Sequence, residues 1–446
     1  MGARKVAVVG AGIAGLGAAW VLARDGYDVV VLERERHAGG RLTSEAVDGF
    51  RLDTGGSTLS SADRELLDWV DALGLRDELL PLRPVVAAQP HRGRIREIDP
   101  RSLIGIARIP GVKPRHGLRL LRLPRLLARF GERIDPDAPE RAADFDDRSL
   151  ADFGRLYFGA SVLERWMTPF VGSACPCDER QASRVLFLQR YRRHAAARMG
   201  LPRAPLAELP AAAAAALAPR YGAQVTRIEG RAGGGVRLAL RAGGRDRDLD
   251  VDAAVVATRA PDAARLAAPV LTSAELRALA SVRYAPALSL TVGLRRPFAP
   301  YPLRIQVPRA EGSALESALL EPGLPGGRVP DTRGLLVLRA TSRWSEANAD
   351  APEARLEQAL LEGFGRIAPG VADAALFTRL QRAPAAHPRF DVGRYREIAQ
   401  LARVQRELRR EGRRVYFAGD YLMDPSWNGA LASGRRAARA LQADLG

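Results

Sequence analysis

Cysteine and long apolar runs are scarce in this sequence, and each shortage excludes a class of protein. Cysteine occurs only at Cys175 and Cys177, which is too few for a disulfide framework and favours a reducing compartment. This Cys-Pro-Cys pair lacks the His or Cys partners of a closed metal site, so we predict no metal. No run of about 18 uncharged apolar residues occurs, which argues against a membrane-spanning helix. The N-terminus reads directly into a strand, so we expect no signal peptide and a cytoplasmic location.

Lysine is the scarcest charged residue, occurring only at Lys5 and Lys113. The formal net charge of +17 therefore comes almost entirely from arginine, which is spread along all 446 residues. No recognised nucleic-acid motif and no aromatic-rich strand accompany this charge, so we expect no nucleic-acid partner. A chain of this length is too long for one simple core, and we expect two or three packed units. The sequence predicts no particular oligomeric state.

The densest basic stretch runs from His91 to Phe130. Its last part, from Leu118, mixes Leu and Arg as an amphipathic basic helix does, although Pro124 interrupts it. Two interpretations of residues 101–130 stay open. In the first, the segment contacts the inner face of an anionic membrane peripherally or admits an apolar substrate. In the second, it is an arginine-coated helix that covers a core.

The chain opens with the pattern of a dinucleotide site. Residues 5–9 are a short β-branched run typical of a buried parallel strand, and residues 16–24 read as a helix. Gly-x-Gly-x-x-Gly lies between them: the first glycine permits a tight turn, the second lets the backbone approach a pyrophosphate, and the third lets helix and strand pack closely. The helix N-terminus then presents free N–H groups to the phosphates. We predict cofactor contacts at Gly10, Gly12, Ile13, Ala14 and Gly15.

A second strand over residues 28–32 ends at Glu33, about where a ribose hydroxyl acceptor is expected. A carboxylate at this position accepts from the adenosine ribose and repels a 2′-phosphate, so FAD or NAD is favoured over NADP. We include Glu33 and the adjacent Arg34 among the cofactor contacts.

The sequence that follows resembles the flavin-containing amine oxidoreductase superfamily. An acidic strand end leads to Gly39-Gly40-Arg41, and a second glycine pair follows at Gly55-Gly56. The resemblance implies that Gly40 and Arg41 lie along the FAD pyrophosphate, and that Gly55, Gly56 and Ser57 pass close to the flavin ring. Backbone that threads past a long flat cofactor favours glycine in the same way.

The C-terminal end carries the matching half of this resemblance. A strand over residues 415–418 leads to Gly419-Asp420, and a helix begins at about Asn428. The resemblance implies that Gly419 and Asp420 contact the ribityl or pyrophosphate region. It also implies that the helix start at Asn428, Gly429 and Ala430 points at the flavin edge that becomes negative on reduction. In the middle of the chain we expect Val225 against the adenine and Thr258 at the end of the closing strand.

These features predict an α/β fold with a discontinuous Rossmann-type FAD-binding domain. Its pieces are residues 1–75, 200–270 and 405–446. Residues 76–199 are predicted to be a helical, basic insertion that faces substrate or membrane, and residues 271–404 a substrate-binding domain built on a mixed or antiparallel sheet.

The predicted function is removal of a hydride from a C–H bond of an apolar or conjugating small molecule by non-covalent FAD. Two departures from the amine-oxidase pattern favour the porphyrinogen oxidase-like and phytoene desaturase-like branches. No lysine lies in the substrate region, and no cysteine lies near the final motif. Three alternatives stay open: an amine or amino-acid oxidase, a redox-neutral FAD-dependent isomerase, and a non-enzymatic prenyl or lipid carrier. The electron acceptor stays undetermined. Candidate substrate-facing side chains are His387, as a proton acceptor, Arg339, as a carboxylate ligand, Trp427 and Asn428.

Overall fold

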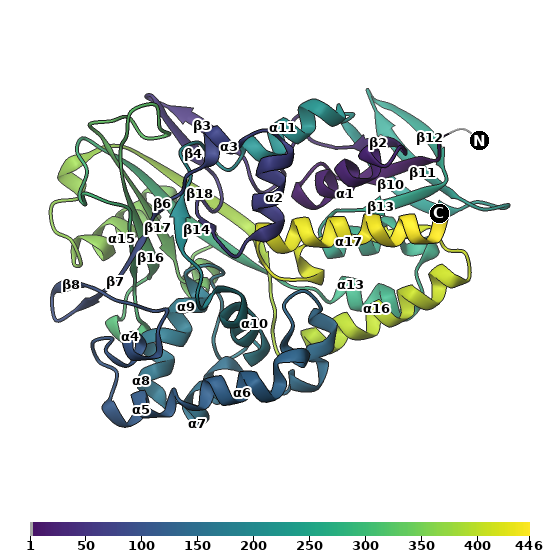
Figure 1. Cartoon of the computed structure of the whole chain (residues 1–446). Helices are drawn as coiled ribbons and strands as arrows, with labels where there is room; N and C mark the ends of the chain where they lie inside the picture. The colour runs from purple at the N-terminus through teal and green to yellow at the C-terminus, as the bar shows by residue number, and fades with distance from the viewer. Residues whose placement is uncertain (1–2) are drawn as a thin grey trace.

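Three distant parts of the chain meet in one four-stranded parallel sheet (Figure 1). The computed structural model describes residues 3–446. The strands are short β-branched runs because a parallel strand covered on both faces must be apolar throughout. Val255 pairs with Val8 on one side and with Tyr416 on the other. In sheet order the strands are β19 (Val415–Phe417), β13 (Ala253–Val256), β1 (Lys5–Val9) and β2 (Asp28–Leu32).

Alternate residues of this sheet point into two separate apolar cores. The core that contains Val8 is covered by α1 (Ile13–Arg24) and α17 (Trp427–Leu445), which run side by side in Figure 1, together with α2 (Arg64–Ala72) and α11 (Glu208–Leu217). The opposite core contains Val9. It is covered by β10 (Ala223–Gly230), β11 (Val236–Ala242), β12 (Arg245–Val251), α12 (Ala260–Leu266) and α13 (Ser273–Ala280). The sheet is therefore shielded from water on both faces.

A second, seven-stranded sheet forms the other half of the molecule (Figure 1). Its strands pair antiparallel except for β15 and β7, which are parallel, so the sheet is mixed. In order they are β18 (Ala375–Pro388), β14 (Tyr284–Leu294), β17 (Gly334–Ala340), β16 (Leu315–Pro322), β15 (Leu303–Gln306), β7 (Val86–His91) and β8 (Arg94–Glu97). Helices α14 (Ser342–Ala347) and α15 (Glu353–Gly365) pack against it. Short strands complete the connections: β3 (Ser44–Val47), β4 (Phe50–Asp53), β5 (Leu59–Ser60), β6 (Arg83–Pro84) and β9 (Met199–Leu201).

A helical layer with its own aromatic core lies beneath both sheets in the view of Figure 1. Trp166 is fully buried there and meets Phe187 and Tyr191 edge to face. The helices of this layer are α4 (Leu103–Ala107), α5 (Pro114–Arg119), α6 (Arg122–Phe130), α7 (Leu150–Tyr157), α8 (Ala160–Val162), α9 (Thr168–Gly172), α10 (Arg184–His194) and α16 (Arg394–Arg410). Helix α3 (Arg76–Leu79) lies apart from them, because its Leu79 is buried in the core that contains Val8. Within residues 3–446, no helix is both long and apolar enough to cross a membrane.

The predicted fold class is confirmed: an α/β nucleotide-binding fold is joined to a mixed substrate sheet and a helical insertion. The domain limits themselves stay a prediction. One detail inside them was wrong, because residues 86–97 form a hairpin on the edge of the large sheet rather than helix. Arg92 and Gly93 both have positive φ, as a tight two-residue hairpin turn requires.

Three predicted element limits shift slightly. Helix α1 begins at Ile13 rather than at residue 16, because the turn closes immediately after Gly12. The closing strand β13 covers Ala253–Val256, so Thr258 lies just beyond it. Pro124 does not interrupt a helix, since α6 begins at Arg122 and proline is tolerated in a first turn.

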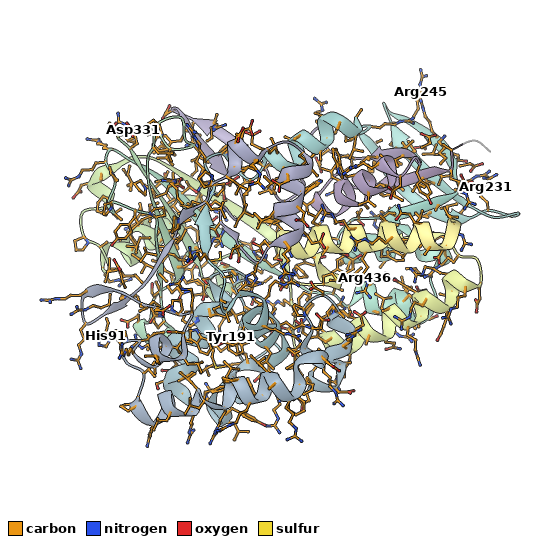
Figure 2. All side chains as sticks on the ribbon, in the orientation of Figure 1. His91, Tyr191, Arg231, Arg245, Asp331 and Arg436 are labelled. Atoms are coloured by element: carbon orange, nitrogen blue, oxygen red, sulfur yellow. The ribbon has the colours of Figure 1, made fainter. Side chains whose placement is uncertain are left out.

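Arginine reaches every edge of the molecule, as the predicted spread of charge requires. Arg231 and Arg245 project from the hairpins of β10, β11 and β12 at one end (Figure 2). Arg436 lies on α17 and pairs with Glu140. Many other surface arginines also pair with nearby carboxylates, as Arg237 does with Asp250.

The close packing of α1 on α17 yields a stability prediction. A Cβ at Gly434 would collide with the carbonyl oxygen of Ala14, which cannot move without disturbing the glycine-rich turn. We expect Gly434→Ala to lower the free energy of unfolding by about 1–3 kcal/mol, measured by urea denaturation. The control is Gly365→Ala in α15, where no atom lies within 4 Å of an added Cβ. Equal midpoints for the two variants would contradict the packing argument.

Candidate active site

The turn between β1 and α1 is open where a phosphate is expected. Gly10 has a φ of +104°, and a Cβ at Gly15 would collide with its carbonyl oxygen. An added Cβ at Gly12, in contrast, would meet nothing within 4 Å. No side chain caps the N-terminus of α1, so the N–H groups of its first turn face this opening. The turn therefore has the shape and the donors of a phosphate cradle.

Glu33 lies at the end of β2, beside this turn, and is 9% exposed. Its carboxylate accepts the N–H of Ala11 at 2.7 Å and that of Glu35 at 2.9 Å. Strand β10 begins against it, since the N–H of Ala223 donates to the Glu33 carbonyl. Buried Val225 follows two residues later, as an adenine-facing position requires. Arg34, in contrast, is exposed and pairs with Glu35.

Arg41 and Asp420 bring together the predicted contacts from the two ends of the chain. Arg41 Nη1 lies 2.9 Å from Asp420 Oδ2 and donates to the carbonyl oxygen of Ala386 at 2.6 Å. Asp420 is 4% exposed, and its Oδ1 is buried without a hydrogen-bond partner. A buried carboxylate oxygen of this kind calls for a donor from a ligand.

The N-terminus of α17 differs in one respect from the expectation. Helix α17 begins at Trp427, and the Ser426 hydroxyl already accepts the N–H of Gly429 at 3.0 Å. The N–H of Ala430 donates to the Ser426 carbonyl, so neither of these two N–H groups is free. The N–H of Gly429 is therefore not available to the flavin, because the side chain of an N-cap serine accepts the N–H of the second or third residue of the helix. Asn428 accepts the N–H of Leu66, and its Nδ2 is buried without a partner.

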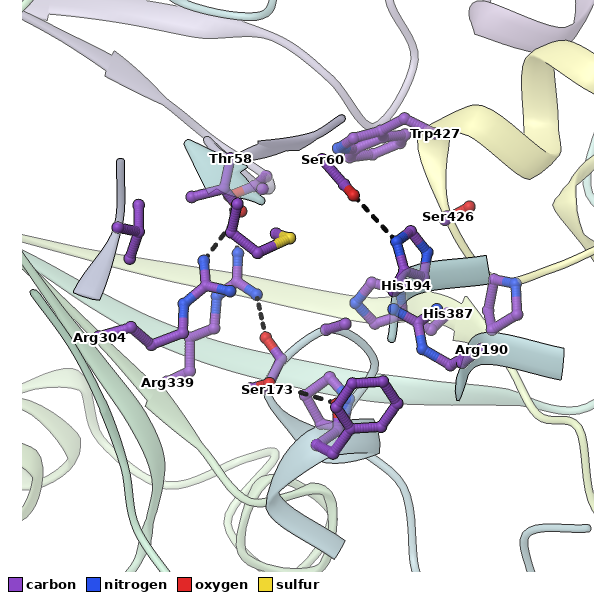
Figure 3. A pocket seen from close by; sticks show the side chains of 18 of the residues that line it. Thr58, Ser60, Ser173, Arg190, His194, Arg304, Arg339, His387, Ser426 and Trp427 are labelled. Atoms are coloured by element: carbon purple, nitrogen blue, oxygen red, sulfur yellow. Dashed lines mark hydrogen bonds between the residues drawn. The ribbon is translucent and has the colours of Figure 1, made fainter. Parts of the chain in front are cut away.

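A cavity of about 920 Å³ connects these cofactor positions to the large sheet (Figure 3). Gly40, Arg41, Gly55 and Gly56 line one end of it, together with Asp420. The four predicted substrate-facing residues come from three separate parts of the sequence and all line the same cavity; they are Arg339, His387, Trp427 and Asn428.

The glycine pair at Gly55 and Gly56 makes room for two of these side chains. An added Cβ at Gly55 would lie 2.8 Å from the Trp427 ring. One at Gly56 would lie 3.3 Å from Trp427 Nε1 and 3.5 Å from Arg339 Nη2. Trp427 therefore packs on the segment that the resemblance assigns to the flavin, and the adjacent Ser57 is buried.

His387 is poorly suited to the predicted role of proton acceptor. It lies near the end of β18, paired with Ala285 of β14. Burial lowers the pKa of His387 to about 3, and the charges of Arg41 and Arg339 add to this effect. The imidazole is therefore neutral at pH 7, and taking up a proton is costly. His387 is therefore a neutral hydrogen-bonding group rather than the predicted proton acceptor.

Sequence reasoning missed several polar residues of the cavity wall. Arg190 pairs with Asp424 at 3.3 Å, and His194 Nδ1 lies 3.0 Å from Ser60 Oγ. Arg304 of β15 donates to Thr58 Oγ1 at 2.8 Å. Arg304 carries the same signal that identified Arg339, an arginine within an otherwise apolar strand. Arg190 and His194 become neighbours of the cavity only through packing of α10.

The cysteines lie closer to the site than their sequence positions indicate. Cys175 is 3% exposed, and residues on both sides of it, Ala174 and Pro176, line the cavity. Burial raises the pKa of the Cys175 thiol to about 12, so the thiol stays protonated and is a poor nucleophile. Non-covalent attachment of FAD therefore stays the prediction. Within residues 3–446, no three His, Cys, Asp or Glu side chains are placed to hold a metal.

The residues present fit a flavin dinucleotide. These residues supply an open glycine turn, a buried carboxylate at the predicted ribose position, and unpaired buried polar atoms on Asp420 and Asn428. The family of flavin-containing amine oxidoreductases matches residues 13–442. The chain belongs to this family. Its cofactor is FAD, as predicted.

Individual relatives are similar over parts of the chain. Protoporphyrinogen oxidase 2 of Arabidopsis thaliana is 28% identical over 179 residues, which are 39% of this chain and 33% of that protein. Putrescine oxidase of Kocuria rosea is 51% identical over 72 residues, which are 16% and 15% of the two chains. These matches span a third or less of each relative. The solved structure of cyclohexylamine oxidase from Brevibacterium oxydans superposes with a TM-score of 0.77, at 20% identity over 99% of both chains, which shows the shared fold.

The position of Glu33 predicts its contribution to FAD retention. We expect Glu33→Ala to weaken FAD binding by about 1–3 kcal/mol, because the ribose hydroxyls and the Ala11 N–H lose their buried acceptor. Fluorescence titration of the apoprotein with FAD measures this change. The control Glu35→Ala removes an exposed carboxylate two residues away and should leave the affinity unchanged. Unchanged affinity in Glu33→Ala would mean that the ribose position is assigned wrongly.

Proposed function

We propose that this oxidoreductase removes a hydride from a C–H bond, in C–C or C–N linkage, of an apolar small molecule whose product is stabilised by conjugation. Porphyrinogen-like and polyene-like compounds belong to this class. The chemistry that a bound flavin supplies is acceptance of that hydride.

The main support for this proposal is the charge of the cavity wall: among the described residues that line it, seven are arginines and three are carboxylates. The carboxylates on the wall are Asp63, Asp99 and Asp420. Asp420 pairs with Arg41, and Asp99 accepts from the Ser102 hydroxyl. Asp63 accepts the N–H of Ser60, and burial raises its pKa to about 6. A cationic amine would therefore meet a wall in which arginine charge exceeds carboxylate charge.

The chain's own residues have three roles under this proposal. Trp427, on Gly55 and Gly56, supplies an apolar surface that holds a flat substrate and excludes water. His387 supplies a neutral polar contact. Lys5 in β1 and Lys113 before α5 both lie outside the cavity wall, so no lysine acts there.

The three alternative functions differ in what they require of this chain. An amine or amino-acid oxidase is the first, because putrescine oxidase and cyclohexylamine oxidase are among the relatives. A redox-neutral isomerase would use the same FAD-contacting residues and differ only in the absence of net oxidation. A non-enzymatic carrier would not need the intact segment from Gly419 to Ala430.

Anaerobic reduction of the flavin tests this ranking. The purified protein should be yellow, with FAD released by acid or heat. We expect porphyrinogens or polyenes to bleach the visible flavin band faster than primary amines, because the cavity repels cations. Stopped-flow mixing with porphyrinogens, polyenes, amino acids and amines measures the rates. Rapid bleaching by an ordinary amine alone would promote the amine-oxidase alternative, and a colourless protein that takes up no FAD would overturn the proposal.

We also propose that the helical layer contacts an anionic membrane surface. Four large apolar side chains are more than half exposed on neighbouring helical elements: Ile104, Leu118, Leu121 and Leu156. Arginines alternate with them along α5 and α6. Arg101, just before α4, also lines the cavity, so this surface adjoins the cavity mouth. Apolar side chains among arginines are suited to reversible, salt-sensitive attachment.

Liposome flotation tests the membrane contact. We expect flotation with anionic vesicles at low salt, loss of flotation at high salt, and weaker flotation in the double variant Leu118→Ser, Leu121→Ser. The matched control is Leu376→Ser, which removes an exposed leucine from β18. A protein that stays unbound to anionic vesicles at low salt would exclude membrane contact and leave the soluble-cover interpretation of residues 101–130.

A further inference from the structure

Two arginines on the large sheet lie at one end of the cavity without an acidic partner. Strand β16 separates their strands, β15 and β17. Arg304 pairs across the sheet with Leu319, and Arg339 pairs with Ser317 and Ser289. Both side chains line the cavity, and Figure 3 shows their guanidinium groups next to each other, away from His387 and His194.

Within the described part of the chain, Arg304 and Arg339 lack a carboxylate partner, whereas other buried arginines of this molecule have one. Arg328, which is 1% exposed, pairs with both Asp53 and Glu321. Arg190 pairs with Asp424, and Arg309 with Glu316. For Arg304 and Arg339, no carboxylate oxygen of residues 3–446 lies within 4.0 Å. Two adjacent cations in a low-dielectric wall are costly unless an anion joins them.

The existing hydrogen bonds hold the two guanidinium groups without saturating them. Arg304 donates to Thr58 Oγ1 at 2.8 Å. Arg339 makes two long contacts of 3.4 Å, to the carbonyl oxygens of Ser173 and Gly55. Each guanidinium carries five N–H donors, so several stay available to a ligand. Gln381 adds a further buried donor, because its Nε2 has no partner and its side chain lines the same cavity.

We propose that Arg304 and Arg339 together bind a carboxylate of the substrate, so that the substrate is an apolar carboxylic acid. This rests on the proposed function and narrows its substrate class. A planar carboxylate matches the donor fork of arginine and accepts from two such groups at once. The wall around the pair includes Leu288, Ala340 and Met199, which suit an apolar body attached to the acid.

The position of the pair orients the substrate. Arg339 Nη2 lies 3.5 Å from the site of an added Cβ on Gly56, the segment that the family resemblance places beside the flavin ring. An acid anchored there extends its apolar body along the face of Trp427 toward His387. Burial and the charge of Arg339 lower the pKa of the Arg304 guanidinium, and a bound carboxylate would reverse that shift.

Calorimetric titration of the FAD-loaded protein tests this carboxylate site without turnover. The probes share one chain length and differ in charge: decanoate, methyl decanoate and decylamine. We expect decanoate to bind wild-type protein and to lose about tenfold or more in affinity in Arg304→Gln and in Arg339→Gln. Arg339→Lys should retain part of the affinity, and methyl decanoate should bind all variants equally weakly. The control Arg198→Gln, an exposed arginine on the cavity rim, should bind decanoate as wild type does.

Flavin content and melting temperature of each variant show that the fold is retained. Equal affinity of the acid and its ester for wild type, or an equal loss in Arg198→Gln, would overturn the carboxylate site. Binding of inorganic phosphate to the pair, with no binding of decanoate, would overturn it as well. Failure of the proposed function looks different, because the flavin would then be bleached by none of the conjugating substrates, whatever the calorimetry shows.

Discussion

The backbone contact between α1 and α17 is the constraint on which the rest of the structure depends. Gly434 lies directly on the carbonyl of Ala14, and Gly17 lies on the side chain of Leu431, so the two helices approach more closely than side chains permit elsewhere. This contact holds the first and last segments of the chain together. The glycine turn at Gly12 and the buried Asp420 consequently belong to one site, although about 400 residues separate them.

Buried charge joins the nucleotide-binding half to the large sheet. Arg328 pairs at 2.5 Å with Asp53, at the end of β4, and also with Glu321 on β16. Glu321 additionally pairs with Arg83. Because both partners of Arg328 are present, its charge is compensated in the interior. The cluster sets how β4 meets the sheet, and the glycine pair at Gly55 and Gly56 follows directly from that strand into the cavity.

Burial dominates the protonation state of two groups at the cavity: nearby arginines reinforce its effect on His387, whereas Arg190 opposes its effect on Cys175 without outweighing it. His387 is held neutral, and Cys175 is held as a thiol, so neither group is prepared for proton or covalent chemistry at pH 7. The protein groups therefore position and shield a substrate, and the redox chemistry is left to the cofactor. This division explains why no catalytic triad or carboxylate pair stands out along the chain.

The half of the protein that binds the cofactor could be predicted from local patterns in the sequence. Strands, glycine spacing and the acidic strand end at Glu33 are local patterns, because a phosphate cradle is built from consecutive residues. The same local character allowed the sequence to predict a sheet within residues 271–404, where the structure has β14 and β17. The hairpin turn at Arg92–Gly93 is also a local pattern. The prediction missed it because the surrounding sequence is strongly basic.

The half of the protein that faces the substrate could not be predicted in this way, because its residues meet only in the folded chain. Arg190 and His194 lie on α10, and nothing in the local sequence sets them apart from residues of the surface. Arg304 lies within an apolar strand, but only the fold places it beside Arg339. Likewise, the occupied N–H of Gly429 and the low pKa of His387 depend on neighbours that the fold supplies. Burial and pairing are properties of the assembled cavity, because the cost of a charge is set by every group that surrounds it.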